Sequence, residues 1–523
     1  MLCVLALVLA GAASLDQSPV QADRQNELRL AGPVQGPETL DPAQMRDLST
    51  VTILRQIYRG LVYYDDALNP VPELAESYQV SDDGLTYTFQ MRSGATFHNG
   101  DPITADDVAF SLSRAVNPDS VEGDRSLLSG PAFLSDIVGF GDVYSGESDL
   151  MSGIVVTADD ALSITLAAPR STFLMKLASV PAAIVDRAQV ETDSTWWAHP
   201  NGSGPYAVDG WEPGEELSLV RYDEFVLGKP QIETINVRLG TRSLQAFNLY
   251  QSDQVEVASV SIFDVDRVSD PNGLFVDQVV RTPQFGFGYI SFRTDVAPFD
   301  DPKIREALQR AFPRYDMASI MFNGLVNTAT GLIPDGMLGK DWDSAVPEAN
   351  IDAARRSIAE SSYGSPDNVP PIRIYASGSL ASDLLRHVAE DELGLTIQVF
   401  DLQWYDFLDR LDSAPIPAFE LYWAADYPDP EAILLALWGS GQPNNYTGYS
   451  NPEVDRILAE AAAEPDPAFR AEMYADAQRL ILADNVVIPA YMDVDYQVVK
   501  PYVENLTITP IGILRLETAS IEQ

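Results

Sequence analysis

The chain of 523 residues contains one cysteine, Cys3, and only five lysines. A single cysteine excludes any disulfide within the chain and leaves no thiol outside the first apolar stretch. The 77 acidic residues far outnumber the 33 basic ones, which gives a net charge of −44. Such a charge repels the phosphates of nucleic acids and of anionic lipids. We therefore exclude a nucleic-acid-binding protein and predict a solvated acidic surface.

Long apolar runs are also missing, since no stretch of membrane-spanning length follows residue 15. The first residues, MLCVLALVLAGAAS, have the length of a signal-peptide core, and Val20-Gln21-Ala22 is an A-x-A-like cleavage point. We interpret residues 1–22 as a signal peptide or an N-terminal anchor. No cysteine follows the small residues, which argues against a lipid anchor. The remaining length suffices for at least two lobes.

Motifs of catalysis are absent as well. The chain has no nucleophile elbow, Walker loop, dinucleotide fingerprint or H-E-x-x-H sequence. Its three histidines, His98, His199 and His387, are far apart in sequence, and we expect them on the surface rather than on a metal. The sequence predicts a protein that is not an enzyme and that holds no cofactor and no metal.

Residues 80–115 predict a strand, a turn and a helix. Asp83-Gly84 supplies a turn, after which apolar and polar residues alternate through 85–91 with the period of a half-buried strand. Thr104 and Asp107 have the spacing of a capping box at the start of a helix. Residues 201–239 begin with glycines and a proline and continue as strands broken by Pro-Gly and Gly-Lys-Pro turns.

The second half of the chain alternates helices and strands. Asp301 and Pro302 have the types expected at the start of a helix. Two strands, PIRIYASG and LTIQVFDL, flank a helix around residues 380–392, an order that predicts a parallel pair. Asp426 follows the next apolar strand, and ligands of open α/β sheets gather at the carboxyl ends of strands. This position suits a binding site.

Taken in order, several stretches resemble the extracytoplasmic solute-binding proteins of ABC importers, specifically the dipeptide- and oligopeptide-binding family. The matching pieces are TLDP at 39–42, IYRGLVYYD at 57–65, the segment from PELAES to FSLSR, GSGPY at 202–206, DPKIREALQRA and YWAADYPDP. They cover most of residues 27–500. The ordered set is more specific than any one piece.

The resemblance implies an α/β fold of the two-lobed periplasmic-binding-protein type II, with an extra subdomain inserted in the first lobe. Carried onto this sequence, it gives lobe I as 27–60, 199–288 and 493–523, the inserted subdomain as 61–198, and lobe II as 289–492. The lobes would be joined by crossing strands and would close over a ligand.

The resemblance also implies site residues. Asp426 matches the aspartate that receives the ligand's ammonium group, and a charge-assisted pair there would contribute about 1.5–3 kcal/mol. An aspartate that caps a helix after Pro428 is the alternative. Trp423 and Trp404 match positions whose indoles line pockets for the ligand's side chains. The backbone of Ala424 and Ala425 would pair with the ligand. Tyr491 and Gly204 are weaker candidates. Core packing remains the alternative for both indoles.

The ligand's length and class stay open. The stretch YASGSLASD at 375–383 has no base where dipeptide-binding members carry an arginine for the ligand's carboxylate, so oligopeptides are favoured over strict dipeptides. The alternative ligands on the same scaffold are an oligosaccharide and a nickel complex. We expect a monomer that serves an ABC permease from the periplasm or from outside the cell, at the outer face of the cytoplasmic membrane if it is anchored.

Overall fold

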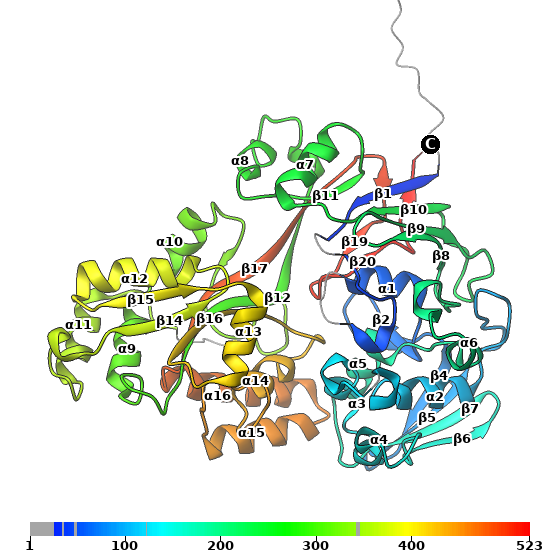
Figure 1. The fold of residues 1–523 in the computed structure, drawn as a ribbon, viewed down its shortest axis with the longest axis horizontal. Helices are drawn as coiled ribbons and strands as arrows, with labels where there is room; N and C mark the ends of the chain where they lie inside the picture. The colour runs from blue at the N-terminus through cyan, green and yellow to red at the C-terminus, as the bar shows by residue number, and fades with distance from the viewer. Residues whose placement is uncertain (1–25, 34–35, 46–49, 122, 341–345, 523) are drawn as a thin grey trace, which may run out of the picture.

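The protein consists of two lobes joined by long strands, as the computed structural model in Figure 1 shows. The structure describes residues 26–33, 36–45, 50–121, 123–340 and 346–522. The segment interpreted as a signal peptide or anchor lies outside these residues. Among the described residues, no helix is both long enough and apolar enough to span a bilayer.

One large sheet runs through both lobes, in the order β15-β14-β16-β12-β17-β11-β1-β10-β9-β8, with β13 paired to β17. Its strands are β1 (Glu27–Ala31), β8 (Tyr206–Glu212), β9 (Glu216–Arg221), β10 (Thr234–Arg238), β11 (Val257–Ser259), β12 (Val279–Phe292), β13 (Asn327–Thr328), β14 (Ile372–Ala376), β15 (Ile397–Asp401), β16 (Ala418–Ala424) and β17 (Val487–Val499). The antiparallel pair β12 and β17 carries the chain between the lobes.

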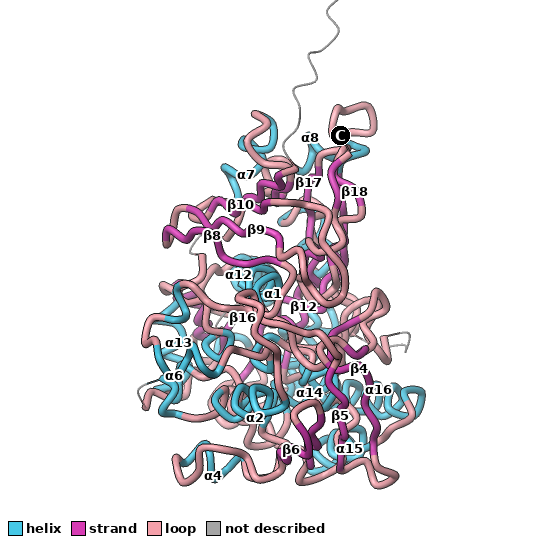
Figure 2. The backbone as a smooth tube through the Cα atoms, turned by 90° about the vertical axis from the view of Figure 1, so that its right-hand side faces the viewer, coloured by secondary structure: helices cyan, strands magenta, loops and turns pink. Residues whose placement is uncertain are grey.

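Lobe I, on the right of Figure 1, contains a second sheet of four antiparallel strands in the order β4-β5-β7-β6. These strands are β4 (Ala75–Val80), β5 (Thr86–Met91), β6 (Ile154–Ala158) and β7 (Ala161–Thr165). Figure 2 views this lobe from its outer side, with β8, β9 and β10 in the upper part and the four-stranded sheet in the lower part.

The helices of lobe I lie between and beside these sheets. They are α1 (Val51–Ile57), α2 (Ala105–Arg114), α3 (Pro131–Leu134), α4 (Phe140–Ser145), α5 (Phe173–Leu177), α6 (Arg187–Thr192), α7 (Ser243–Gln251) and α8 (Val265–Val268). The short strands β2 (Val62–Tyr64) and β3 (Pro70–Pro72) pair beside α1, and the short pairs β18 (Val503–Glu504) with β21 (Ser520–Ile521) and β19 (Thr507–Ile508) with β20 (Leu514–Arg515) follow near the C-terminus.

Lobe II, on the left of Figure 1, packs helices around the β14, β15 and β16 end of the large sheet. These helices are α9 (Pro302–Ala311), α10 (Arg314–Asp316), α11 (Ile351–Glu360), α12 (Leu380–Leu393), α13 (Trp404–Ser413), α14 (Glu431–Trp438), α15 (Pro452–Ala463) and α16 (Pro467–Ala483). β14 and β15 are parallel and flank α12, which confirms the predicted order.

Local sequence signals explain where several elements begin. The capping box of Thr104 and Asp107 opens α2, as predicted. Asp301 accepts a hydrogen bond from the backbone N–H of Lys303 and begins α9. In residues 201–239 the predicted sheet is present as β8, β9 and β10, which are antiparallel neighbours.

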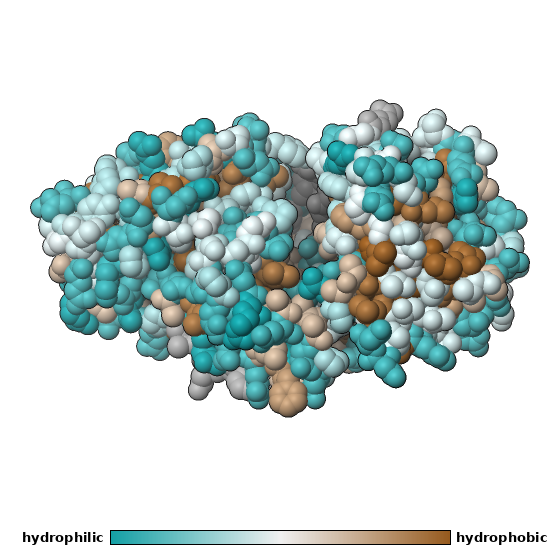
Figure 3. Space-filling view, turned by 90° about the horizontal axis from the view of Figure 1, so that it is seen from below, coloured by the Kyte–Doolittle hydropathy of each residue, from teal (hydrophilic) through white to brown (hydrophobic). Residues whose placement is uncertain are grey.

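The two lobes meet at a continuous apolar core. One buried cluster includes residues from α1, β5 and α5 of lobe I together with residues from α14, α15 and α16 of lobe II. A second cluster fills lobe II around α9, α11 and α12. The space-filling view shows that the surface is nevertheless hollowed between the lobes (Figure 3). The lobes therefore touch along part of their boundary and leave a groove on the face that Figure 3 shows.

Candidate functional site

The C-terminal half of β16 has one edge without a strand partner among the described residues. On one side β16 pairs with β12 along its full length, from Ala418 to Ala424. On the other side β14 pairs with it only through Phe419. Beyond that point no strand of the described residues pairs with this edge, so the backbone groups that face it can bond an extended segment.

The register identifies which backbone groups face this edge. The N–H of Ala425 donates to the carbonyl of Phe285, 2.7 Å away, on the β12 side. Because successive residues of a strand direct their backbone groups to alternate edges, Ala424 and Tyr422 direct theirs away from β12. Of the two predicted alanines, Ala424 thus offers open hydrogen-bonding groups, and Ala425 holds the strand end in place.

Asp426 follows this edge, and its side chain is exposed. Among the described residues it has no ion pair and no hydrogen bond to its carboxylate, and Asp429 rather than Asp426 accepts the N–H of Glu431 at the start of α14. The capping alternative for Asp426 is therefore not what the structure contains. Although solvent reaches the carboxylate, the protein around it removes part of its hydration, which raises the pKa of Asp426 to about 6.

The charge of Asp426 in lobe II acts on Tyr64 of lobe I. Burial raises the pKa of the Tyr64 hydroxyl, and the negative charge of Asp426 contributes further to that increase. Tyr64 donates its hydroxyl hydrogen to the carbonyl of Met175, 2.5 Å away. Asp426, which has no counterion among the described residues, therefore lies close enough to lobe I for its charge to act there, and an ammonium group from outside the protein would be stabilised beside it.

The two tryptophans have different environments. The indole of Trp423 is half-buried, and its N–H donates to the carbonyl of Ala432 at 2.9 Å, so its polar group is already used. Trp404 begins α13 with 48% of its surface exposed, and its ring lies 6.1 Å from that of Phe407. Trp404 therefore has the more accessible indole face.

Tyr491 lies on β17, two strands away from β16. Its ring packs directly over Gly288 of β12, where a Cβ atom would come within 2.2 Å of it, and its centroid lies 4.6 Å from that of Phe322. On the same face of the sheet, Tyr422 donates its hydroxyl hydrogen to Asp493 at 2.7 Å. The glycine in β12 therefore makes room for a tyrosine ring over the strand next to β16.

Gly204 lies apart from these residues, in lobe I. Its N–H donates to Ile57 and its carbonyl contacts the ring of His98, and a Cβ atom at this position would come within 2.2 Å of the carbonyl oxygen of Gln56. Both backbone groups of Gly204 are thus used where its loop packs against the end of α1. A role for Gly204 in ligand binding stays a prediction.

One expectation about the histidines is wrong. His98 is largely enclosed rather than solvated, and burial lowers its pKa to about 4. Its Nε2 lies 3.0 Å from the carbonyl of Gly204, because the loop at 202–206 folds over the turn that carries it. Within the described ranges, no group of three or more histidine, cysteine, aspartate or glutamate side chains is arranged to hold a metal ion.

Sequence reasoning missed a set of contacts between the lobes. Glu431 at the start of α14 pairs with Lys176 of α5 at 3.2 Å and accepts a hydrogen bond from Thr172 at 3.0 Å. These residues are about 255 positions apart, and no local pattern connects them. Only the fold brings them together.

Comparisons with known proteins give one consistent result. The family model described as bacterial extracellular solute-binding proteins, family 5 middle, matches residues 69–445. The periplasmic oligopeptide-binding protein OppA of Salmonella typhimurium is 25% identical over 96% of this chain and 94% of its own. The dipeptide-binding protein DppE of Bacillus subtilis is 25% identical over 89% of this chain and 87% of its own.

A solved structure has the same fold. The structure of Haemophilus influenzae OppA in complex with the peptide RPPGFSPFR superimposes with a TM-score of 0.80, covering 96% of this chain and all of that one (100%), at 20% identity.

Proposed function

Because the chain belongs to the bacterial extracellular solute-binding proteins of family 5, we propose that it is the receptor of an ABC importer and captures peptides between its lobes. It is a binding protein rather than an enzyme. The observation that carries the proposal is the exposed carboxylate of Asp426, which has no ion pair within the described ranges and directly follows an open strand edge. A peptide has a matching pair of features, a terminal ammonium group and a backbone that can extend the sheet.

The ligand binds along β16 in this proposal. Its ammonium group pairs with Asp426, its backbone bonds to Ala424 and Tyr422, and the indoles of Trp423 and Trp404 receive its side chains. Flat indole rings offer apolar area without selecting one particular side chain of the ligand. Relatives named for oligopeptides and for dipeptides are equally similar to this chain, and we favour oligopeptides because residues 375–383 contain no base for a nearby carboxylate.

The division of the chain follows from the same proposal. Residues 27–60, 199–288 and 493–523 form lobe I, residues 61–198 its inserted subdomain, and residues 289–492 lobe II. The crossing strands β12 and β17 support these boundaries, since they lie at 279–292 and 487–499. Bending there closes the lobes over the peptide, and the closed monomer then docks on a permease outside the cytoplasmic membrane.

The test uses the protein's own ligand. Peptides that co-purify are released, identified by mass spectrometry and synthesised, both with a free amino terminus and with an acetylated one. Calorimetry on Asp426→Asn should show a loss of about 2–5 kcal/mol of binding free energy, because the ammonium group is left unpaired. Acetylation should cost the unchanged protein a similar amount.

A matched control is Asp367→Asn, which removes an exposed carboxylate elsewhere in lobe II and should leave the affinity unchanged. Equal affinity of Asp426→Asn and the unchanged protein would contradict the peptide proposal. Co-purification of an oligosaccharide whose binding survives Asp426→Asn would favour the sugar alternative, because an amide keeps much of the hydrogen bonding to hydroxyl groups.

A further inference from the structure

A buried contact joins the two lobes at the opposite end of the loop that begins with Asp426. We call it the interlobe latch and define it as Thr172 and Lys176 of lobe I with Tyr427 and Glu431 of lobe II. Glu431 and Lys176 are 2% and 6% exposed. Their elements, α14 and α5, face each other across the boundary between the lobes in Figure 1.

Glu431 bonds mainly to the other lobe. One carboxylate oxygen lies 3.2 Å from the Nζ atom of Lys176, and the second accepts the hydroxyl hydrogen of Thr172 at 3.0 Å. From its own lobe the carboxylate accepts the hydroxyl hydrogen of Tyr427 at 3.3 Å. Separation of the lobes would remove both partners from lobe I and expose the carboxylate to water.

Lys176 has a partner in its own lobe as well. Its Nζ atom lies 2.9 Å from Asp136, which also pairs with Arg170 at 2.9 Å. Burial alone would lower the pKa of Lys176, but the charges of Glu431 and Asp136 raise it above its ordinary value. While the lobes are in contact, the carboxylates of Glu431 and Asp136 therefore stabilise the charged ammonium group of Lys176 despite its burial.

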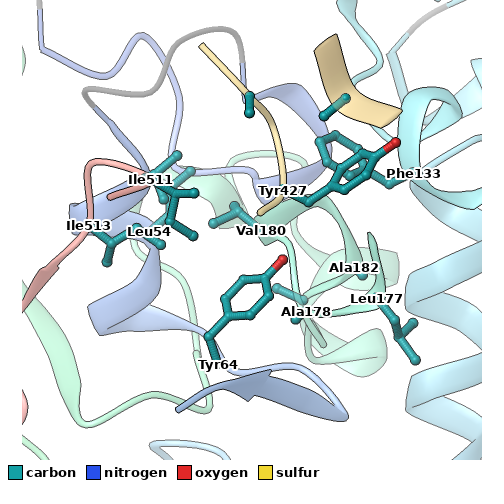
Figure 4. Packing of buried hydrophobic residues seen from close by; sticks show 14 of the residues in the cluster. Leu54, Tyr64, Phe133, Leu177, Ala178, Val180, Ala182, Tyr427, Ile511 and Ile513 are labelled. Carbon is teal, nitrogen blue, oxygen red and sulfur yellow. The ribbon is translucent and has the colours of Figure 1, made fainter. Parts of the chain in front are cut away.

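Apolar contacts surround the ion pair. Tyr427 is 6% exposed and belongs to the shared buried cluster, which also contains Phe133 of α3; both are labelled in Figure 4. Nearby, the N–H and the hydroxyl of Ser171 both donate to the carbonyl of Ala462 in α15, at 2.9 and 3.1 Å. The latch thus excludes water around its charges, which strengthens their attraction.

We propose that the interlobe latch sets the fraction of molecules in which the lobes are closed, and through that fraction the affinity for ligand. Asp426 and Tyr427 are adjacent, so the residue that receives the ligand and the residue that enters the other lobe move together. The effect on affinity rests on the proposed function, because a receptor whose closed form is less populated binds its ligand more weakly in proportion. Lys176, Thr172 and Glu431 are positioning residues in this proposal.

The experiment measures the distance between the lobes directly. Cys3 is replaced by serine, since it is the only cysteine, and spin labels are attached to Asp149→Cys in lobe I and Ala459→Cys in α15, both exposed positions. Pulsed electron paramagnetic resonance without added peptide then gives the ratio of short to long distances. We expect Lys176→Met and Glu431→Gln each to lower that ratio about tenfold, because each removes the buried ion pair that joins the two lobes.

Two further variants keep the test decisive. Thr172→Val removes one hydrogen bond to Glu431 with little change in volume and should lower the ratio about threefold. Lys229→Met removes a lysine that pairs with Asp223 inside lobe I, 2.7 Å away, and should leave the distances unchanged. If Lys176→Met, Glu431→Gln and Thr172→Val all give the same distances as Lys229→Met, the proposal is wrong.

The result is separable from the test of peptide binding. If the lobes separate in Lys176→Met but the unchanged protein binds no peptide, the proposed function fails and the latch remains. If peptide binds and the three latch variants bind it with unchanged affinity and unchanged distances, the latch fails and the proposed function remains.

Discussion

Two aspartates three positions apart on one loop have opposite surroundings. Asp426 is exposed and has no ion pair among the described residues, whereas Asp429 is fully buried and pairs with Arg470 of α16 at 3.0 Å. In each case the protein around the carboxylate raises its pKa to about 6, and at Asp429 the charge of Arg470 opposes that increase. Asp429 carries its own counterion within the fold, whereas Asp426, which we propose for ligand binding, has none among the described residues.

The largest expected effect concerns Asp429, the aspartate that pairs with an arginine. Arg470→Met leaves Asp429 buried without its partner, and we expect a loss of about 3–5 kcal/mol in the free energy of unfolding. Urea denaturation without peptide measures it. Arg456→Met, which removes an exposed arginine of α15, is the control and should unfold at the same urea concentration as the unchanged protein. Similar midpoints for both variants would mean that the buried pair contributes nothing.

The second effect concerns Asp426 and the binding of its proposed ligand. Only the ionised carboxylate of Asp426 pairs with an ammonium group, and its pKa is about 6 in the protein without ligand. Peptide affinity should therefore fall about tenfold for each pH unit below 6. Calorimetry at pH 5, 6 and 7 measures this. Asp426→Asn should lose that dependence, and a pH profile shared by both proteins would assign the titration to another group.

The smallest effect is on stability without ligand. A raised carboxyl pKa means that the folded protein binds a proton more readily than the unfolded chain, so Asp426 lowers stability as the pH rises from about 4 to 6. Asp426→Asn should therefore be more stable at pH 7, by about 1 kcal/mol after allowance for solvent screening. The difference should vanish at pH 4. Urea titrations at both pH values measure it, and a less stable variant at pH 7 would show that Asp426 supports the fold.

Local elements of this fold could be predicted because their signals lie within a few residues. Thr104 and Asp107 are three positions apart and close a capping box, and Asp301 begins α9 through the N–H of a residue two positions on. Alternation in 85–91 places Tyr87, Phe89 and Met91 in the core. In each case the residues that form the element are close to one another in the sequence.

The candidate site could be predicted only in part. The position of Asp426 at the end of a strand is a local feature, and its proposed role comes from resemblance to a family. The open edge of β16 depends on how far β14 extends beside it, and the latch depends on Lys176 and Glu431 meeting across two lobes. The enclosure of His98 is not predictable for the same reason, because Gly202 and Gly204, about a hundred positions away in sequence, fold over it. Such contacts depend on tertiary packing that no short pattern carries.

The uncovered stretch of β16 has an evolutionary consequence. Main-chain groups such as those of Ala424 and Tyr422 are common to every residue type, so mutations cannot easily abolish them, and they recognise any extended chain alike. In the proposed function, selectivity is then left to side chains such as Trp404 on a separate helix, which can be exchanged without disturbing the strand. A receptor built in this way can change its ligand specificity by substitutions in the side chains that line the site, while the strand that bonds the ligand's backbone stays the same.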